Sequence, residues 1–338
     1  MYLRKDLSLK SLNTFGIDAK ASYFGEFYSV MELQNFIADP EFHQVEKLIL
    51  GGGSNLLFTK DFDGIVLHNK IKGKEIIEHN DEYAYVRAGA GEIWHEFVLF
   101  CIENGFAGLE NLSLIPGTVG AAPMQNIGAY GVEIKDSFAH LEAVNIIDGK
   151  IYTFDKESCQ FGYRESIFKK ELKGQYIITS VVFKLSKKPQ FNISYGAIKT
   201  TLEEMGIENI SIKAISDAVC SIRKSKLPDP AVIGNAGSFF KNPEIPETQY
   251  DALKARFPDI PSYKTTPGMV KVPAGWLNEQ CGWKGRIVGR TGVHKNQALV
   301  LVNYGNATGA EVKKLSEDIK RSVKEKFGIE LEIEVNII

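Results

Sequence analysis

Residues 45–58 read Val-Glu-Lys-Leu-Ile-Leu-Gly-Gly-Gly-Ser-Asn-Leu-Leu-Phe, and this stretch decides the fold. Residues 45–50 predict a short buried strand that runs directly into glycines 51–53. Glycines after a strand suggest phosphate binding through backbone N–H groups, although a flexible turn explains three glycines equally well. The dinucleotide fingerprint G-x-G-x-x-G is absent, because Leu56 replaces its last glycine and strand and turn follow instead of a helix. A β-rich α+β domain that holds a diphosphate on a loop therefore fits better than a Rossmann fold.

Composition limits the class of protein. The chain has 338 residues, of which 44% are hydrophobic and 24% charged, so we expect a globular protein of two or three domains. Its net charge of −2 gives no global basic field of the kind that nucleic-acid binders use, and we expect no nucleic-acid partner. The charged N-terminus and the lack of an 18-residue apolar segment predict neither a signal peptide nor a membrane span. The four cysteines are widely spaced in the sequence: Cys101, Cys159, Cys220 and Cys281. This spacing predicts no metal site, and scattered free thiols indicate a reducing compartment such as the cytoplasm.

Hydrophobic periodicity and the residues that cap or end helices and strands predict the other elements. Strands are expected at 83–88, 141–147 and 176–185, and helices at 92–103, 197–206, 216–226 and 309–327. Ser216 or Asp217 can cap the third of these helices. The last helix begins with a capping box at Thr308 and ends at Gly328. Residues 246–267 indicate a loop-rich segment. Residues 329–337 alternate with period two, which predicts a strand with an apolar core face and an exposed face: Glu330, Glu332 and Glu334.

Two stretches combine glycine with groups that could bind a ligand. Residues 116–131 are crowded with Gly, Ala and Pro, so they could lie flat against a planar ligand, with Gln125 and Asn126 on its edge. The second stretch, residues 234–243, reads Gly-Asn-Ala-Gly-Ser-Phe-Phe-Lys-Asn-Pro and combines a hydroxyl, a cation and an amide with an apolar wall. Surface loops and a tight turn before a buried strand are the plainer interpretations.

Charge is concentrated in one region. Residues 262–295 hold six basic side chains against one acid, Glu279, which suits a phosphorylated ligand or a solvated basic face. Arg164, in Gly-Tyr-Arg-Glu-Ser, offers a planar fork for a carboxylate or a phosphate, although an arginine beside a glutamate is more often a surface ion pair.

These motifs, in this order, resemble the UDP-N-acetylenolpyruvoylglucosamine reductase family. The resemblance covers nearly the whole chain and rests on five motifs: residues 51–55, 125–131, 162–164, 234–243 and 331–335. It implies an α+β fold, with a two-part FAD-binding region of the vanillyl-alcohol-oxidase (PCMH-type) class and a smaller α+β substrate-binding domain. The implied boundaries are 1–70, 71–227 and 228–328, with the C-terminal strand 329–338 packing back near the site.

The resemblance also implies the chemistry. UDP-N-acetylglucosamine enolpyruvate would be reduced to UDP-N-acetylmuramate, with NADPH as reductant and a hydride passing from flavin N5 to the alkene. Arg164 matches the residue that stabilises the developing negative charge, Ser238 matches the proton donor, and Glu334 matches the third catalytic residue. A serine hydroxyl is protonated near neutral pH, and an enolate is basic enough to take that proton.

Binding residues follow from the same resemblance. FAD would lie along Gly51, Gly53, Ser54, Asn55 and Gly128, and would be non-covalent because Ser54 and Asn55 follow the glycines where related oxidases carry a histidine. The nucleotide sugar would contact Tyr163, Tyr195, Lys226, Asn242, Tyr263, Lys284 and Gln297, with the lysines near its phosphates. The segment around Tyr195 is similar to the substrate-covering loop of the longer subtype of the family. We expect a cytoplasmic monomer.

Two other functions remain open at this point. A flavin oxidase of the same fold would pass electrons to oxygen, although a neutral alcohol substrate would not need the basic region at 262–295. A nucleotide-binding module without catalysis would not need Arg164, Ser238 and Glu334. The sequence alone does not show that these three residues converge.

Overall fold

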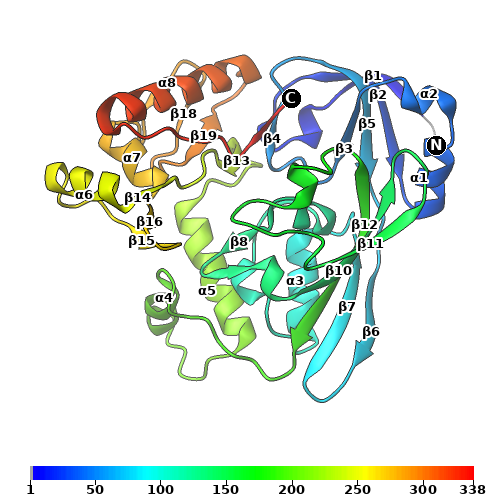
Figure 1. The fold of residues 1–338 in the computed structure, drawn as a ribbon, viewed down its shortest axis with the longest axis horizontal. Coiled ribbons are helices and arrows are strands. Elements are labelled where there is room, and N and C mark those ends of the chain that lie inside the picture. Colours follow the sequence, from blue (N-terminus) through cyan, green and yellow to red (C-terminus); the bar gives the residue numbers. More distant parts are fainter. Residues whose placement is uncertain (1–2) are drawn as a thin grey trace. The chain divides into compact units, whose positions relative to one another are not determined.

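The computed structural model describes residues 3–338 and divides into two compact units (Figure 1). The first unit comprises residues 1–7, 21–52 and 63–224, and the second comprises residues 8–20, 53–62 and 225–338. The predicted division of the chain at residues 70 and 227 stays a prediction.

A small sheet opens the first unit. Its strand order is β1 (Arg4–Ser8), β2 (Lys20–Phe27), β5 (Phe62–Asn69) and β3 (Lys47–Leu50), and β3 runs parallel to β5. Helices α1 (Val30–Ile37) and α2 (Pro40–His43) lie between β2 and β3 in the chain. The predicted strand at 45–50 begins two residues later, and only Leu50 in it is buried, so the expectation of a buried strand was wrong there.

A five-stranded antiparallel sheet forms the centre of the first unit. Its order is β11 (Ile151–Asp155), β10 (Phe138–Asn145), β12 (Tyr176–Ser186), β7 (Tyr83–Gly89) and β6 (Lys74–His79). Helix α3 (Trp94–Glu103) packs against it, with the Trp94 and Phe97 rings 5.8 Å and 5.2 Å from the ring of Phe183. These contacts confirm the strands predicted at 83–88 and 176–185 and the helix predicted at 92–103.

The small-residue segment 116–131 folds into short turns: η3 (Val119–Ala121), η4 (Pro123–Gln125) and β8 (Gly128–Ala129), which pairs with β9 (Val132–Glu133). A Cβ on Gly120 would lie 2.5 Å from the Cβ of Ala90, so this glycine is required by packing within the protein. Asn126 is fully buried and donates to Glu133 and to the Gly162 carbonyl, at 2.9 Å each. The expectation that Asn126 contacts a ligand edge was therefore wrong.

Helices α4 (Ile198–Glu204) and α5 (Ile212–Lys226) follow the sheet. The predicted start of α5 at Ser216 or Asp217 was wrong, because the Ser211 side chain accepts from the Ala214 N–H at 3.1 Å and begins the helix. Ser216 is buried inside the helix, where its hydroxyl is 2.7 Å from that of Ser113.

The second unit is built on a four-stranded antiparallel sheet of order β13 (Gly234–Ser238), β19 (Val300–Asn303), β18 (Thr291–Val293) and β17 (Ile287–Val288). A three-stranded sheet joins β14 (Glu244–Pro246), β16 (Met269–Lys271) and β15 (Tyr263–Lys264), and helices α6 (Glu247–Arg256) and α7 (Ala274–Gln280) belong to the same unit. Helix α6 corrects the expectation of a loop-rich segment, because it buries only Leu253 and so leaves almost no apolar period in the sequence.

At the end of the chain the predicted helix caps are confirmed, and the predicted strand is wrong. Helix α8 (Gly309–Phe327) has the Thr308 capping box and the left-handed Gly328 that the sequence predicts. Residues 329–335 alternate in burial but form no regular ladder beyond a single bridge between Ile333 and Phe240, whereas β20 (Asn336–Ile337) pairs in parallel with β4 (Leu56–Leu57). Glu330 and Glu332 are exposed as expected, whereas Glu334 is half-buried.

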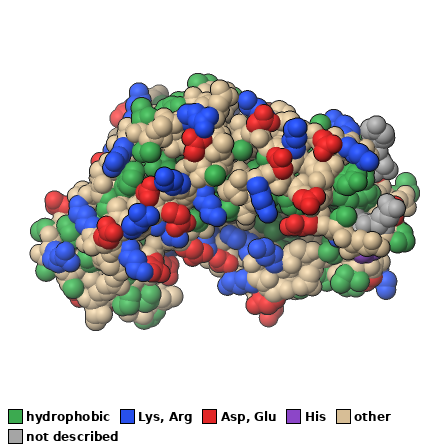
Figure 2. All heavy atoms as spheres, turned by 90° about the horizontal axis from the view of Figure 1, so that it is seen from above, with side chains coloured by type: hydrophobic (Ala, Val, Ile, Leu, Met, Phe, Trp, Pro, Cys, Tyr) green, Lys and Arg blue, Asp and Glu red, His purple; other side chains and the backbone are tan. Residues whose placement is uncertain are grey.

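Surface charge is mixed. Lys and Arg side chains lie interspersed with Asp and Glu on the face shown in Figure 2, in keeping with the net charge of −2. Across residues 3–338, no helix has the length and apolarity needed to cross a membrane.

Candidate active site

The glycine loop, residues 51–55, connects β3 to β4 and is held on both sides. A Cβ on Gly52 would lie 2.8 Å from the Gly117 Cα, and one on Gly53 would lie 2.0 Å from the Leu12 carbonyl oxygen. Gly53 has φ of 61°, and its carbonyl accepts from the Thr14 N–H at 3.0 Å. The N–H groups of Gly52, Gly53 and Ser54 donate no hydrogen bond within the described residues. The loop therefore presents three successive backbone donors, as anion-binding loops do.

Arg164 is fixed by its own backbone and by its neighbours in the first unit. It lies in the left-handed region with φ of 56°, inside a tight turn closed by a reciprocal pair of hydrogen bonds between Gly162 and Glu165. Its Nη2 donates to the Gly128 carbonyl at 2.8 Å, and its guanidinium carbon lies 5.3 Å from the Tyr163 ring centre. A Cβ on Gly128 would lie 3.2 Å from Arg164 Nη1, so this glycine makes room for the arginine.

The segment that carries Tyr195 is anchored within the first unit by buried Asn111. The Asn111 amide donates to the carbonyls of Tyr130 and Asn192, at 3.1 Å and 2.8 Å, and the Asn192 amide donates to the Gly131 carbonyl at 3.2 Å. Tyr195 itself is 47% exposed. An exposed aromatic ring on an anchored loop can cover a ligand without first being released from a core.

Ser238 ends strand β13 after an irregularity in its pairing with β19 at Ala236 and Gly237. Gly237 has φ of 71°, and its N–H donates to the buried Asn235 side chain at 3.0 Å. Phe239, the next residue, is fully buried and packs edge-on against the Phe15 ring at 6.3 Å. The half-buried Ser238 is therefore held between a tight turn and a core aromatic residue.

Glu334 lies beside this segment in the second unit. Its N–H donates to the Phe239 carbonyl at 2.9 Å, and Phe240 and Ile333 form an antiparallel bridge. Its carbonyl accepts from the Asn55 side-chain amide at 3.4 Å. The structure thus brings together, within one unit, the segments of Ser238 and Glu334 and the end of the glycine loop.

Comparison with known proteins decides the family. A family model described as UDP-N-acetylenolpyruvoylglucosamine reductase, C-terminal domain, matches residues 229–338, and an FAD binding domain model matches residues 24–155. UDP-N-acetylenolpyruvoylglucosamine reductase of Flavobacterium johnsoniae is 52% identical over 339 residues, and that of Amoebophilus asiaticus is 53% identical over 338 residues, each match covering 100% of both chains. The chain belongs to the UDP-N-acetylenolpyruvoylglucosamine reductase family. It is a flavoenzyme of peptidoglycan precursor synthesis that uses FAD and NADPH, as the sequence predicted.

Solved structures confirm the fold. The UDP-N-acetylenolpyruvylglucosamine reductase of Thermus caldophilus has a TM-score of 0.67 at 24% identity and covers 99% of both chains. The 4-ethylphenol oxidase of Gulosibacter chungangensis has a TM-score of 0.55 at 12% identity, over 99% of this chain and 86% of that chain. Both likenesses concern the fold alone. They agree with the predicted combination of an FAD-binding region and a smaller α+β domain.

The glycine loop fits the diphosphate of FAD, the cofactor of this reductase family. Three N–H groups in a row that donate no hydrogen bond within residues 3–338 match the acceptor oxygens of a diphosphate, and the glycines keep side chains away from them. Gly51, Gly53, Ser54 and Asn55 belong to this loop, whereas Gly128 lies beside Arg164 in the first unit. Among residues 3–338 no group of His, Cys, Asp and Glu side chains could hold a metal ion.

Gly53→Ala is expected to lower both FAD affinity and stability. The new Cβ would meet the Leu12 carbonyl and would also strain a residue at φ of 61°. Gly282→Ala is the matched control, because Gly282 has φ of 76° and open space around its Cβ position. We expect the control to cost about 1 kcal/mol of unfolding free energy, and Gly53→Ala to weaken FAD binding at least tenfold, about 1.4 kcal/mol. FAD titration of the apoprotein measures this, and equal FAD affinity in both variants would contradict it.

The other residues predicted for the nucleotide sugar lie on several elements of the two units. Tyr263 is exposed on β15, and Lys226 is exposed at the end of α5. The Asn242 side-chain oxygen accepts from the Ala274 N–H at 2.9 Å and so supports the start of α7. The Gln297 side-chain oxygen accepts from the Leu299 N–H at 3.3 Å. Asn242 and Gln297 therefore have structural bonds besides any role in binding.

The basic region at 262–295 is partly neutralised. Lys271, Lys284 and Arg290 form ion pairs with Glu244, Glu279 and Glu311 at 3.2, 2.9 and 2.8 Å. Lys284 and Glu279 are both well exposed, so their attraction is weak and a phosphate could replace the glutamate as partner. The local positive charge is therefore smaller than the sequence count indicates.

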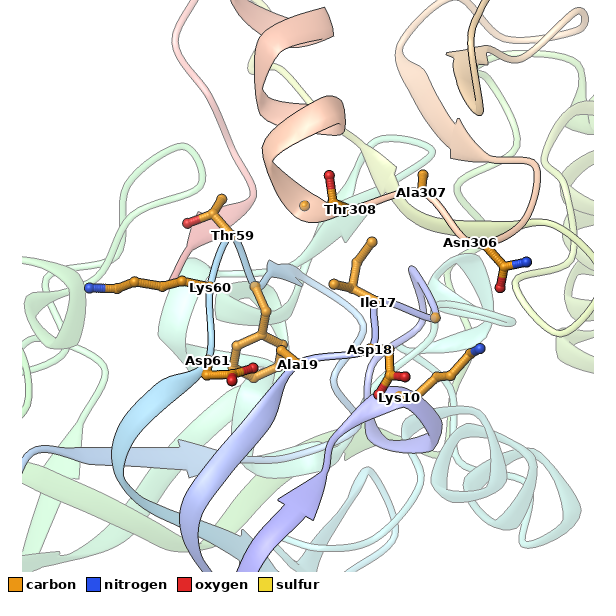
Figure 3. A pocket seen from close by; sticks show the side chains of 13 residues that line it. Lys10, Ile17, Asp18, Ala19, Thr59, Lys60, Asp61, Asn306, Ala307 and Thr308 are labelled. Atoms are coloured by element: carbon orange, nitrogen blue, oxygen red, sulfur yellow. The ribbon is translucent and has the colours of Figure 1, made fainter.

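A cavity of about 320 Å³ in the second unit contains none of the predicted site residues (Figure 3). Its carboxylates already accept hydrogen bonds, Asp18 from the Ser8 hydroxyl at 2.7 Å and Asp61 from the Lys20 N–H at 2.8 Å. Figure 3 shows Lys10 beside Asp18 and the first turn of α8 at the rim. Nothing in this cavity identifies a ligand.

Sequence reasoning named Lys241 as the cation of residues 234–243 but missed its ion pair, and it did not single out His68. Buried Lys241 pairs with Glu332 at 2.5 Å, next to the Ser238 segment, and no local pattern links residues 91 positions apart. His68 on β5 is 8% exposed within an apolar strand. Burial, assisted by the charge of Lys70, lowers the pKa of His68 to about 4, against the opposing effect of Glu26.

His68 should make stability depend on pH. Its pKa in the folded protein is about 4 against 6.5 in the unfolded chain, so between these values the unfolded chain binds a proton that the folded chain does not. The contribution is therefore fully present above pH 6.5 and is lost as pH falls toward 4, about 3 kcal/mol in all. Urea unfolding from pH 4 to 7 measures it: the free energy of His68→Gln, relative to wild type, should rise on acidification by this amount. Parallel pH profiles would contradict the burial of a neutral histidine.

Proposed function

We propose that this chain reduces UDP-N-acetylglucosamine enolpyruvate to UDP-N-acetylmuramate with NADPH, and that Arg164, Ser238 and Glu334 carry out the chemistry. The observation that most supports the roles of Ser238 and Glu334 is the hydrogen bonding in the second unit, where the Glu334 segment bonds to both Phe239 and Asn55. Residues from three distant parts of the chain that match family motifs thereby share one place in the fold.

Non-covalently bound FAD, once reduced by NADPH, would supply the hydride for the enolpyruvyl alkene. The residues of this chain stabilise the negative charge that develops on the substrate and donate the proton that completes the reduction. Arg164 stabilises the negative charge that builds on the alkene carbon next to the carboxylate, because its guanidinium stays protonated at all working pH values. Its hydrogen bond to the Gly128 carbonyl and its position over the Tyr163 ring fix the orientation of the guanidinium group. A fixed cation of this kind needs no reorganisation as charge develops.

Ser238 donates the proton to the carbon that Arg164 stabilises. The irregularity at Ala236 and Gly237 and the buried Phe239 restrict the backbone of Ser238, so its hydroxyl is held in place for transfer. Glu334 is half-buried and its backbone bonds to the segment that carries Ser238, which supports a role in orienting the hydroxyl or sharing the proton.

The substrate contacts follow the family motifs. Lys226 and Lys284 would lie near the diphosphate, and Asn242, Tyr263 and Gln297 would hold the sugar and the base. Tyr163 and Tyr195 belong to the first unit, and the exposed Tyr195 ring on its anchored segment supports the longer subtype with a substrate-covering loop. These assignments, and the division into regions 1–70, 71–227 and 228–328, are proposals.

We also propose a cytoplasmic monomer. Cys101, Cys159, Cys220 and Cys281 are free thiols, which suits a reducing compartment. A single chain supplies every residue assigned above.

Product analysis tests the function. Under anaerobic conditions the protein, NADPH and UDP-N-acetylglucosamine enolpyruvate should give a product heavier by two hydrogens, with one NADPH oxidised per product. A flavin oxidase would instead consume oxygen and release peroxide, leaving the enolpyruvyl ether unchanged. A protein that binds the nucleotide but oxidises no NADPH would support the non-catalytic alternative.

A further inference from the structure

The C-terminal segment pairs with the segment that carries Ser238 through one short antiparallel ladder in the second unit. The Lys241 N–H donates to the Glu332 carbonyl at 2.9 Å. On the other side of a single bridge, the Glu334 N–H donates to the Phe239 carbonyl, also at 2.9 Å. Because the ladder is so short, side-chain contacts must help the backbone to fix which residues lie opposite one another.

The sequence of the C-terminal segment leaves its register open. Residues 330–335 read Glu-Leu-Glu-Ile-Glu-Val, so a shift of two residues would keep every apolar side chain on one face and every glutamate on the other. Such a shift would move Glu334 by about 7 Å along the strand direction. A contact that distinguishes one glutamate from the next is therefore needed to keep Glu334 where it is.

Ion pairs make that distinction. Glu330 pairs with Lys324 of α8, and the two side chains are 73% and 64% exposed. Glu332 instead pairs with Lys241, whose Nζ lies 2.5 Å from the carboxylate and whose side chain is only 8% exposed. An exposed pair contributes little, whereas an ammonium group that water scarcely reaches depends on its counter-charge. The pair of Lys241 with Glu332 is therefore the stronger constraint on the register.

We propose that Lys241 is a positioning residue for the reduction: by pairing with Glu332 it fixes the register of the C-terminal segment and keeps Glu334 beside the segment of Ser238. The proposal rests on the proposed catalytic roles of Ser238 and Glu334. Lys241 needs no contact with flavin or substrate for this effect. The effect falls on the half-reaction that uses those two residues, the reduction of the enolpyruvyl substrate.

Substitutions at the exposed end of the pair test the proposal without altering the buried lysine. Glu332→Gln removes the charge that faces Lys241, whereas Glu332→Asp keeps a carboxylate. Glu330→Gln is the matched control, because Glu330 is 73% exposed against 69% for Glu332, lies two residues away and pairs with an exposed lysine. Lys241→Met, alone and combined with Glu332→Gln, completes the set.

Each variant is studied as the FAD-bound protein, and its Tm shows whether it is folded. Rapid mixing measures flavin reduction by NADPH and flavin reoxidation by the enolpyruvyl substrate separately. We expect Glu332→Gln to slow reoxidation about 10-fold, since a displacement of about 1 Å at a reacting group can cost on the order of 10²-fold. Flavin reduction should keep its wild-type rate, because it does not use Ser238 or Glu334.

The other variants should separate the ion pair from general effects. Glu332→Asp should recover part of the lost rate, and Glu330→Gln should match wild type. The double variant should be no slower than Lys241→Met alone, because both substitutions remove the same interaction. If Lys241→Met does not fold, the Gln and Asp variants of Glu332 still decide the question.

Several results would overturn the proposal. Wild-type reoxidation in Glu332→Gln would do so, as would equal slowing of both half-reactions, equal rates in the Gln and Asp variants of Glu332, or equal losses in Glu330→Gln and Glu332→Gln. Losses that multiply in the double variant would show that Lys241 acts independently of Glu332, which also contradicts it. A wild-type protein whose reduced flavin is not reoxidised by the enolpyruvyl substrate would instead be a failure of the proposed function.

Discussion

Ser238→Ala is expected to slow reoxidation of the reduced flavin by the enolpyruvyl substrate by about 10²–10⁴, the range for loss of a general acid. Flavin reduction by NADPH should keep near its wild-type rate, because that step needs no proton from Ser238. Rapid-mixing absorbance measures each half-reaction separately. The substitution removes one oxygen atom from a half-buried position whose backbone is fixed by neighbouring residues, so the fold should persist.

Ser238→Cys is the informative companion variant. A thiol also carries a transferable proton, so this variant should recover part of the lost rate. If Ser238→Ala slows both half-reactions equally, Ser238 is structural and the proposed role is wrong. The same conclusion would follow if Ser238→Ala and Ser238→Cys had identical rates.

Arg164→Lys should lower the rate of substrate reduction by about 10²–10³, the cost of removing one preorganised electrostatic donor. Lysine keeps the charge but loses the planar fork that bonds the Gly128 carbonyl and lies over Tyr163. Steady-state kcat and the rate of flavin reoxidation should fall together, whereas flavin reduction by NADPH should change little.

Arg87→Lys provides the control for Arg164→Lys. Arg87 lies in the same unit as Arg164, pairs with Glu142 across the five-stranded sheet, and is not among the residues assigned to the reaction. We expect wild-type kinetics in this variant. Equal losses in Arg87→Lys and Arg164→Lys would show that arginine replacement in this unit acts through folding, and wild-type reoxidation in Arg164→Lys would remove Arg164 from the mechanism.

Local signals made much of the fold predictable. The capping box at Thr308 predicted the start of α8, and Gly328 predicted its end. Both signals are local, because each depends on residues within a few positions of one another. Long-range contacts set the rest. Ser216 was mistaken for a helix cap because its bond to Ser113, 103 residues away, leaves no trace in the local pattern. Helix α6 escaped notice because a helix that buries only Leu253 has almost no apolar period.

The candidate site was predictable as motifs and not as geometry. Gly-Gly-Gly-Ser-Asn after a strand indicated a backbone anion site. The N–H groups of Gly52, Gly53 and Ser54, which have no acceptor in the part of the chain that the structure describes, fit that interpretation. Alternation placed Glu334 on the solvent face with two other glutamates, whereas its bond to Phe239 leaves it half-buried. Periodicity cannot tell which of three glutamates on one face is partly buried, because the residue that bonds to Glu334, Phe239, lies nearly a hundred residues earlier in the chain.

One spectroscopic experiment on the wild-type protein tests the central claim most directly. The purified protein is kept anaerobic, NADPH is added, and UDP-N-acetylglucosamine enolpyruvate follows while the visible spectrum is recorded. We predict that NADPH bleaches the flavin band and that the enolpyruvyl substrate restores it without oxygen. A bleached flavin that recovers only when air is admitted would contradict the account and identify the protein as an oxidase.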